Sequence, residues 1–127
     1  MKRLLLDTEV LIWWDMNDAR LGGHARALIQ DAVEILVSAA SAWEIANLVA
    51  LGKLTTTRSV STALQENGFG ELPVTVEQIE TAASLPPHHA DPIDRLIIAA
   101  AIGEGLAVVT ADRRFDQYSV MTVDASS

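Results

Sequence analysis

Short apolar runs alternate with segments of helical pattern along the chain, and this alternation limits the fold more than any other feature. Leu4–Leu6, Glu34–Ser38 and Leu106–Thr110 are dominated by aliphatic residues and are predicted to be buried strands. The first two are followed by segments with helical spacing of apolar residues, and another such segment precedes the third. Strands covered by helices on both faces are typical of parallel sheets. We therefore expect an α/β fold with a mainly parallel central sheet.

The remaining pattern completes one domain, residues 1–127, without a repeat or a linker. Helices are expected over Glu9–Asp15, His24–Val33, Ser41–Gly52, Ser59–Asn67, Val76–Leu85 and Asp91–Ile102. Glu71–Val74 is predicted to be a short edge strand, because proline is tolerated there, and Val120–Val123 a last strand. Trp13, Trp14 and Trp43 are predicted to be core residues.

Composition excludes several kinds of site. The chain has no cysteine, so disulfides and thiolate metal ligands are absent. The formal net charge of −8 disfavours nucleic-acid binding by bulk electrostatics, so a nuclease with this composition needs divalent metal to attract its substrate. The apolar start at Leu4–Leu6 is too short for a signal peptide, and no run approaches the ~18 apolar residues of a membrane span. We expect a cytoplasmic protein with no membrane partner.

Four acidic residues lie at junctions between predicted strands and helices. Asp7 and Asp112 come just after strands, while Glu44 and Asp94 lie in the first turns of predicted helices. In a parallel sheet, the carboxyl ends of strands and the amino ends of helices share one edge, where ligands usually bind. The four carboxylates are therefore expected to converge at that edge.

Each acid also has a purely structural interpretation. Ser41 to Glu44 fits a capping box, and Asp91-Pro92-Ile93-Asp94 fits a cap, a first-turn proline and an acid favoured by the helix dipole. Asp7 fits a helix cap, and Asp112 fits a turn with the arginine that follows it. Taken one at a time, the four acids are explained by these roles.

Together, the four acids indicate a cation site. Crowded carboxylates repel one another and raise at least one pKa unless a cation joins them. Oxygen ligands without histidine or cysteine favour Mg²⁺ or Mn²⁺ over zinc. Two such ions about 4 Å apart activate water and stabilise the leaving oxygen in phosphodiester hydrolysis.

Four motifs carry a resemblance to a known family. L-L-L-D-T-E-V-L-I-W-W, S-A-A-S-A-W-E-I-A, D-P-I-D-R-L-I-I-A-A-A and V-V-T-A-D-R-R-F resemble, in this order, the motifs of PIN domains. More narrowly, the chain is similar to VapC-type toxins of bacterial toxin–antitoxin pairs, from Leu4 to about Tyr118. The resemblance implies a three-layer α/β/α sandwich and a Mg²⁺-dependent endoribonuclease in which Mn²⁺ substitutes.

The resemblance also assigns roles. The family's four metal-binding acids correspond to Asp7, Glu44, Asp94 and Asp112, and the hydroxyl of its T-x-D motif corresponds to Thr110. It implies an RNA substrate, a homodimer and a VapB-type antitoxin. Such an antitoxin binds with a helix in a hydrophobic groove and points a basic residue toward the acids. Glu9 departs from the family pattern and adds a carboxylate to the region.

Residues near the motifs have weaker assignments. Arg95, Arg113 and Arg114 are candidates for contacts with RNA phosphates, with surface ion pairs as the alternative. His88 and His89 follow two prolines and are interpreted as loop residues rather than ligands or a general base. Asp91 is interpreted first as a cap, and both it and Asp116 are expected near the site.

Three other functions compete with this interpretation. A receiver domain has paired acids after the first strand and a lysine after a late one, but no lysine follows Lys53. A haloacid-dehalogenase-like phosphatase has D-x-D after its first strand, and Glu9 breaks that pattern. The third alternative is a PIN-like interaction module whose metal site is idle.

Overall fold

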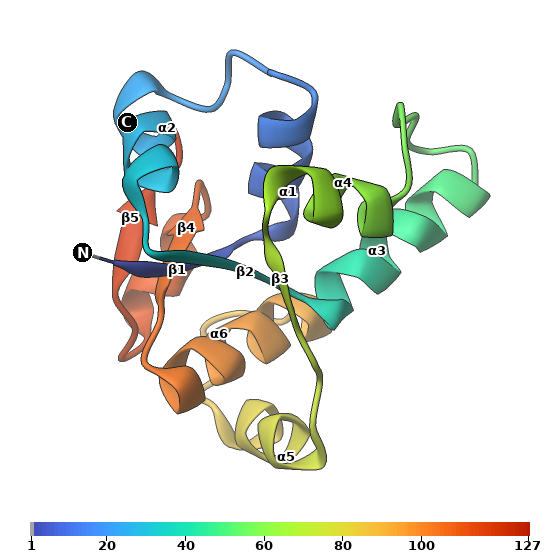
Figure 1. Cartoon of the computed structure of the whole chain (residues 1–127). Coiled ribbons are helices and arrows are strands. Elements are labelled where there is room, and N and C mark those ends of the chain that lie inside the picture. The colour runs from blue at the N-terminus through green and yellow to red at the C-terminus, as the bar shows by residue number, and fades with distance from the viewer. Residues whose placement is uncertain (1) are drawn as a thin grey trace.

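The computed structural model describes residues 2–127, so Met1 lies outside the described residues, and shows a sheet flanked by helices (Figure 1). The strands are β1 (Arg3–Leu6), β2 (Glu34–Ser38), β3 (Gly70–Leu72), β4 (Ala107–Thr110) and β5 (Thr122–Asp124). The helices are α1 (Thr8–Asp15), α2 (Gly23–Asp31), α3 (Ala39–Ala50), α4 (Val60–Asn67), α5 (Val76–Ser84) and α6 (Pro92–Glu104), and a 3₁₀ helix, η1, covers Arg113–Gln117. These bounds agree with the predicted elements to within a few residues.

The sheet is parallel throughout the described part of the chain, with strand order β3-β2-β1-β4-β5. Leu5 in the central strand pairs with Leu36 of β2 on one side and Val108 of β4 on the other. The predicted short strand, β3, lies at an edge, where the proline that follows it costs no ladder hydrogen bond. The predicted parallel sheet is confirmed.

Side chains of β1 alternate between two cores. Leu4 and Leu6 pack in the core that contains residues of α1, α2 and α4, whereas Leu5 packs in the core that contains residues of α6. All three leucines are fully buried, and burying each stabilises the fold by about 1.5–3 kcal/mol. In Figure 1, α1, α2 and α4 lie on one side of the sheet, and α5 and α6 lie on the other. This is the α/β/α sandwich that the motifs imply.

Helix α3 begins earlier than predicted. Ser38 is its N-cap, and the side-chain oxygen of Ser38 accepts a 3.0 Å hydrogen bond from the Ala40 N–H. The capping box proposed for Ser41 and Glu44 is therefore wrong, and Glu44 lies in the second turn rather than the first. The strand runs directly into the helix, so the first serine rather than the second acts as the cap.

Two of the three predicted tryptophan positions agree with the structure. Trp13 is buried, and Trp14 packs against the same core while its indole N–H donates to Asn67. Trp43 is 64% exposed, so its assignment to the core is wrong. Ser41 and Ile45 on either side of it are buried, and a residue two positions from each points away from the core.

Helix α6 combines a capped amino end with a buried middle. Asp91 is the N-cap, as predicted, and its Oδ1 accepts hydrogen bonds from the N–H groups of Ile93 and Asp94. Pro92 occupies the first turn, where its missing N–H costs nothing. The helix ends at Gly105, whose φ of 67° favours glycine. Within residues 2–127, no helix has both the length and the apolar character that crossing a membrane requires.

Candidate active site

Two of the predicted acids follow neighbouring strands. β1 ends at Leu6 and β4 at Thr110, and the two strands pair directly. The N–H of Asp7 donates a 3.0 Å hydrogen bond to the carbonyl oxygen of Val109, which extends the pairing past the end of β1. Asp7 and Asp112 therefore leave the sheet at the same edge, as the junction argument predicts.

The Asp7 carboxylate is buried and held on both of its oxygens. Its Oδ2 accepts a 2.7 Å hydrogen bond from the Thr110 hydroxyl, and its Oδ1 accepts a 2.8 Å bond from the Thr8 N–H. Burial raises the pKa of Asp7 to about 6, although these hydrogen bonds lower it. The negative charges of Glu9 and Asp112 raise the pKa further. A buried carboxylate with negative neighbours favours a cation beside it.

Asp94 shows the convergence of the acids most clearly. It lies in the first turn of α6, and burial is the largest cause that raises its pKa to about 8. Four negative charges raise it as well, those of Asp7, Asp91, Glu44 and Asp112. The predicted acids therefore come close enough to act on one carboxyl group, although they are far apart in the sequence.

Glu44 reaches the cluster from α3. The hydroxyl of Thr8 donates a buried 2.9 Å hydrogen bond to the hydroxyl oxygen of Ser41. This bond joins the start of α1, next to Asp7, to the helix that carries Glu44. The pair of hydroxyl groups thus helps to set the position of α3 relative to the end of β1.

Asp112 has a different environment from the other acids. Burial alone would raise its pKa, but hydrogen bonds from Arg114 and His89 outweigh that effect and lower the pKa to about 2. Arg114 contacts both carboxylate oxygens, through Nε at 3.0 Å from Oδ1 and through Nη2 at 2.8 Å from Oδ2. Asp112 is therefore held ionised next to carboxyl groups whose pKa is raised.

His89 lies in the loop before α6, as predicted, but its side chain belongs to the cluster, which the sequence did not indicate. Its side chain is almost completely buried. Nε2 lies 2.8 Å from Oδ2 of Asp94 and 2.8 Å from Oδ2 of Asp112. His88, by contrast, is exposed. The two adjacent histidines have no sequence feature that distinguishes the buried one from the exposed one.

A family comparison is consistent with this geometry. The family model described as PIN domain matches residues 4–121, nearly the whole chain. The chain belongs to the PIN-domain family. The alternatives of a receiver domain and a haloacid-dehalogenase-like phosphatase are therefore wrong, whereas a PIN-like module with an idle site remains to be tested.

Individual relatives of this PIN domain are toxins of the VapC kind. The chain is 36% identical to Ribonuclease VapC22 of Mycobacterium tuberculosis over 121 residues, 93% of each chain. Its structure is similar to VapBC2 from Rickettsia felis bound to a promoter DNA fragment, with a TM-score of 0.69 at 14% identity over 96% of this chain and 98% of that chain. It is also similar to VapC20 of M. tuberculosis, a toxin that cleaves the sarcin–ricin loop, with a TM-score of 0.69 at 18% identity over 95% and 98% of the two chains.

The donor set of the PIN domain fits a hard divalent cation. Carboxylate oxygens predominate, and a cation beside Asp94 would offset the burial and the four negative charges that raise its pKa. Single ligand atoms of His89, Asp94 and Asp112 all lie within 4.8 Å of one another. Oxygen donors of this kind suit Mg²⁺ or Mn²⁺.

The three candidate arginines have different environments. Arg95 donates hydrogen bonds to four backbone carbonyls, those of Pro86, His89, Ala82 and Leu85. Its guanidinium therefore fastens the loop between α5 and α6, and its contact with RNA phosphate stays a prediction. Arg113 bonds to the Thr110 carbonyl and pairs with Asp116, and it remains half-exposed. Arg114 pairs with Asp112 at the rim of the cluster.

The remaining acids divide into two groups. Asp91 caps α6 and its charge raises the pKa of Asp94, so it lies next to the cluster as predicted. Glu9 is exposed, and its charge reaches Asp7. Asp116 instead accepts a hydrogen bond from Thr122 and pairs with Arg113, so the structure does not place it in the cluster.

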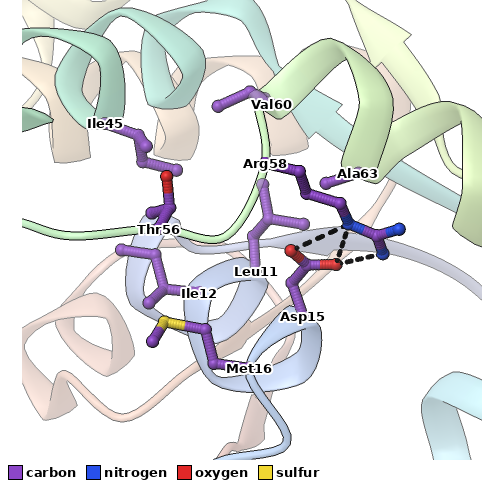
Figure 2. Close-up of a pocket in the computed structure, with 9 residues that line it drawn as sticks. All are labelled: Leu11, Ile12, Asp15, Met16, Ile45, Thr56, Arg58, Val60 and Ala63. Atoms are coloured by element: carbon purple, nitrogen blue, oxygen red, sulfur yellow. Dashed lines mark hydrogen bonds and ion pairs between the residues drawn. The ribbon is translucent and has the colours of Figure 1, made fainter.

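A separate apolar pocket lies between α1, α3 and α4 (Figure 2). Its apolar lining comes from Leu11, Ile12, Met16, Ile45, Val60 and Ala63. Asp15 and Arg58 form an ion pair at one side of it, as Figure 2 shows. A second hollow shares Ile45 and Val60 and continues along α3 past Ala46 and Val49. Together these hollows, here called the α1–α3–α4 groove, contain none of the four acids.

Proposed function

We propose that this PIN domain is a divalent-metal-dependent endoribonuclease, the toxin of a VapBC-type toxin–antitoxin pair. The proposal rests on one observation above all. Burial raises the pKa of Asp94 to about 8, and the converging negative charges of Asp7, Asp91, Glu44 and Asp112 add to this effect. The 36% identity to Ribonuclease VapC22 supports RNA as the substrate class.

In this proposal Asp7, Glu44, Asp94 and Asp112 hold Mg²⁺, with Mn²⁺ as a substitute. When bound, the metal activates water for attack on phosphorus and neutralises charge on the leaving oxygen. Thr110 fixes Asp7 through its 2.7 Å hydrogen bond, so that this carboxylate keeps one orientation. Arg113 and Arg114 lie at the rim of the site and are proposed to meet RNA phosphates.

RNA cleavage by the purified chain tests the proposal. Wild type is expected to cut RNA when Mn²⁺ is added and to stop when the metal is chelated, while Asp94→Asn and Asp7→Asn lose the activity. Asp31→Asn is the matched control. Asp31 ends α2 just before β2, so it lies at the amino ends of the strands, whereas the four acids lie at their carboxyl ends. If neither wild type nor Asp94→Asn cuts RNA, the result would favour the PIN-like interaction module whose metal site is idle.

The antitoxin is proposed to bind the α1–α3–α4 groove. Two of the similar structures are toxin–antitoxin complexes, from Klebsiella pneumoniae and Rickettsia felis. The groove offers apolar residues of α3 at helical spacing, and Val49 and Met16 are more than two-fifths exposed. An amphipathic helix of a VapB-type partner would cover these side chains.

Co-purification tests this partner. The tagged chain is co-expressed with a VapB-type antitoxin, and wild type is expected to retain the antitoxin through a salt wash. Ala46→Arg places a long charged side chain on an exposed position of the groove and is expected to release the antitoxin. Val76→Arg is the control, since Val76 is exposed on α5, outside the groove. Equal retention by both variants would exclude the groove.

Two further expectations stay predictions. A homodimer is expected from the family, and sedimentation of the purified chain would reveal it. A cytoplasmic location is expected as well, and fractionation of cells that express the tagged chain would test it.

A further inference from the structure

His89 has polar partners at its backbone N–H, at its carbonyl oxygen and at both ring nitrogens. Its backbone N–H donates to the Tyr118 hydroxyl at 2.9 Å, and its carbonyl oxygen accepts from Arg95 at 3.1 Å. Nδ1 accepts a 3.1 Å hydrogen bond from the backbone N–H of Asp91. The ring also packs edge-on against Phe115, at 5.9 Å between ring centroids and 83° between ring planes. The imidazole is therefore held rigidly in one place and orientation.

These contacts determine which ring nitrogen carries the hydrogen. Because Nδ1 accepts the Asp91 N–H, its lone pair is used and it bears no hydrogen. The neutral ring then carries its hydrogen on Nε2, which faces Asp112 and Asp94. In this tautomer Nε2 is a hydrogen-bond donor and has no lone pair for a metal.

The two carboxylates that meet at Nε2 come from separate elements. Asp94 lies on α6, whereas Asp112 lies between β4 and η1. Both Oδ2 atoms lie 2.8 Å from the same nitrogen. Two carboxylates so close repel each other and turn apart unless a donor holds them. A donor there leaves Oδ1 of Asp94 for a cation, whereas Oδ1 of Asp112 already accepts hydrogen bonds from the backbone N–H and Nε of Arg114.

We propose that His89 is a positioning residue: its Nε2 donates a hydrogen bond to Asp112 and lies 2.8 Å from Oδ2 of Asp94, so it holds the two carboxylates side by side and does not itself bind the metal. The inference rests on the proposed function, because it assumes that these two acids hold the divalent cation. Partners of metal-binding carboxylates typically affect metal affinity by about 10–100-fold when they are removed.

Metal titration of purified variants tests the role. His89→Ala is expected to weaken Mn²⁺ binding, measured by calorimetry, by about tenfold or more. His89→Gln is expected to recover part of the affinity, since its amide N–H can donate to the same carboxylates. His88→Ala is the matched control and is expected to bind Mn²⁺ as wild type does, because His88 is exposed. Thermal unfolding of each variant shows whether it is folded.

Nitrogen-15 NMR of the wild-type ring supplies a readout that needs no variant. The expected spectrum has the hydrogen on Nε2, both without metal and with saturating Mg²⁺. Loss of that hydrogen when Mg²⁺ binds would make His89 a ligand and overturn the proposal. Unchanged Mn²⁺ affinity in folded His89→Ala would overturn it too.

The same samples separate this inference from the proposed function. If wild type binds Mn²⁺ and cuts RNA, and His89→Ala binds Mn²⁺ with unchanged affinity, only the role of His89 is overturned. Wild type that binds no Mn²⁺ would overturn both. Wild type that binds Mn²⁺ with the expected dependence on His89, but cuts no RNA, would overturn the ribonuclease and keep the positioning role.

Discussion

The hydroxyl of Thr110 donates a 2.7 Å hydrogen bond to Oδ2 of Asp7, and so joins the ends of two neighbouring parallel strands at the candidate site. The Thr110 oxygen in turn accepts a 3.0 Å hydrogen bond from the N–H of Asp112. Thr110 is fully buried, so water does not replace these bonds. One hydroxyl group thus links two of the four acids.

Thr110→Val keeps the shape of the side chain but removes both hydrogen bonds. We expect the free energy of unfolding to fall by about 1–3 kcal/mol, because a buried carboxylate loses its donor. Urea denaturation measures the change. Thr122→Val is the control, since Thr122 donates to Asp116 at an exposed position and its loss should cost under about 0.5 kcal/mol. An equal decrease in the free energy of unfolding for both variants would show that the buried Thr110 bond contributes no more than the exposed one.

The stability of the metal-free chain is expected to fall as pH rises. The pKa values of Asp7 and Asp94 are raised from 3.8 to about 6 and about 8, so over this range the folded chain binds more protons than the unfolded chain. Stability is therefore lost as pH rises from about 4 to about 8. Asp112, whose pKa is lowered to about 2, acts in the opposite direction, but only below about pH 4.

Asp94→Asn isolates this effect. Between about pH 6 and about pH 8 the free energy of unfolding of wild type in chelator should decrease by about 1–3 kcal/mol, and that of the variant should stay nearly level. Denaturant titrations at several pH values measure the difference. A wild type whose stability rises over this interval would contradict the buried, crowded state of Asp94.

Arg95 is expected to be essential for stability. Arg95→Gln removes donors to four carbonyls, one at the end of α5 and three in the segment that joins it to α6, and we expect it to lower the free energy of unfolding by about 2–3 kcal/mol. Arg20→Gln is the control, because the exposed pair of Arg20 with Asp18 contributes little. An Arg95 variant as stable as wild type but defective in RNA binding would contradict this structural role and support the phosphate contact.

Arg114 is expected to compete with the metal. Its guanidinium contacts both oxygens of Asp112, where a cation would bind. Arg114→Gln should therefore raise Mn²⁺ affinity, but by no more than about fivefold, because the arginine is exposed and such pairs contribute about 0–1 kcal/mol. Arg3→Gln, which breaks an exposed pair with Glu34, should leave the affinity unchanged. Weaker Mn²⁺ binding by Arg114→Gln would contradict this competition.

The parts of the fold that follow from local pattern could be predicted from the sequence. β2 coincides with the predicted strand Glu34–Ser38, because a short apolar run followed directly by a helical pattern indicates a buried strand. The meeting of Asp7 and Asp112 at one edge followed from the parallel sheet alone. Local pattern placed these residues because strand ends determine where the chain leaves the sheet.

The sequence failed to show features that depend on contacts between distant parts of the chain. Trp43 lies on α3, a helix with small or apolar residues on most sides, so the sequence could not show which side faces the core. His89 is buried by partners that are as far as 29 residues away, such as Tyr118. The guanidinium of Arg95 similarly donates to backbone carbonyls of a loop, and the sequence does not show the path of that loop.

Thermal unfolding of wild type and Asp94→Asn in increasing Mn²⁺ tests the central claim, that the converging carboxylates bind a divalent cation. Binding to the folded state alone raises the free energy of unfolding of wild type by about 2.7 kcal/mol at about 100 times the Kd. The account predicts a melting temperature that climbs with Mn²⁺ for wild type and stays nearly constant for Asp94→Asn. A melting temperature of wild type that does not change with Mn²⁺ would contradict it. An equal rise in the melting temperatures of wild type and Asp94→Asn would contradict it as well.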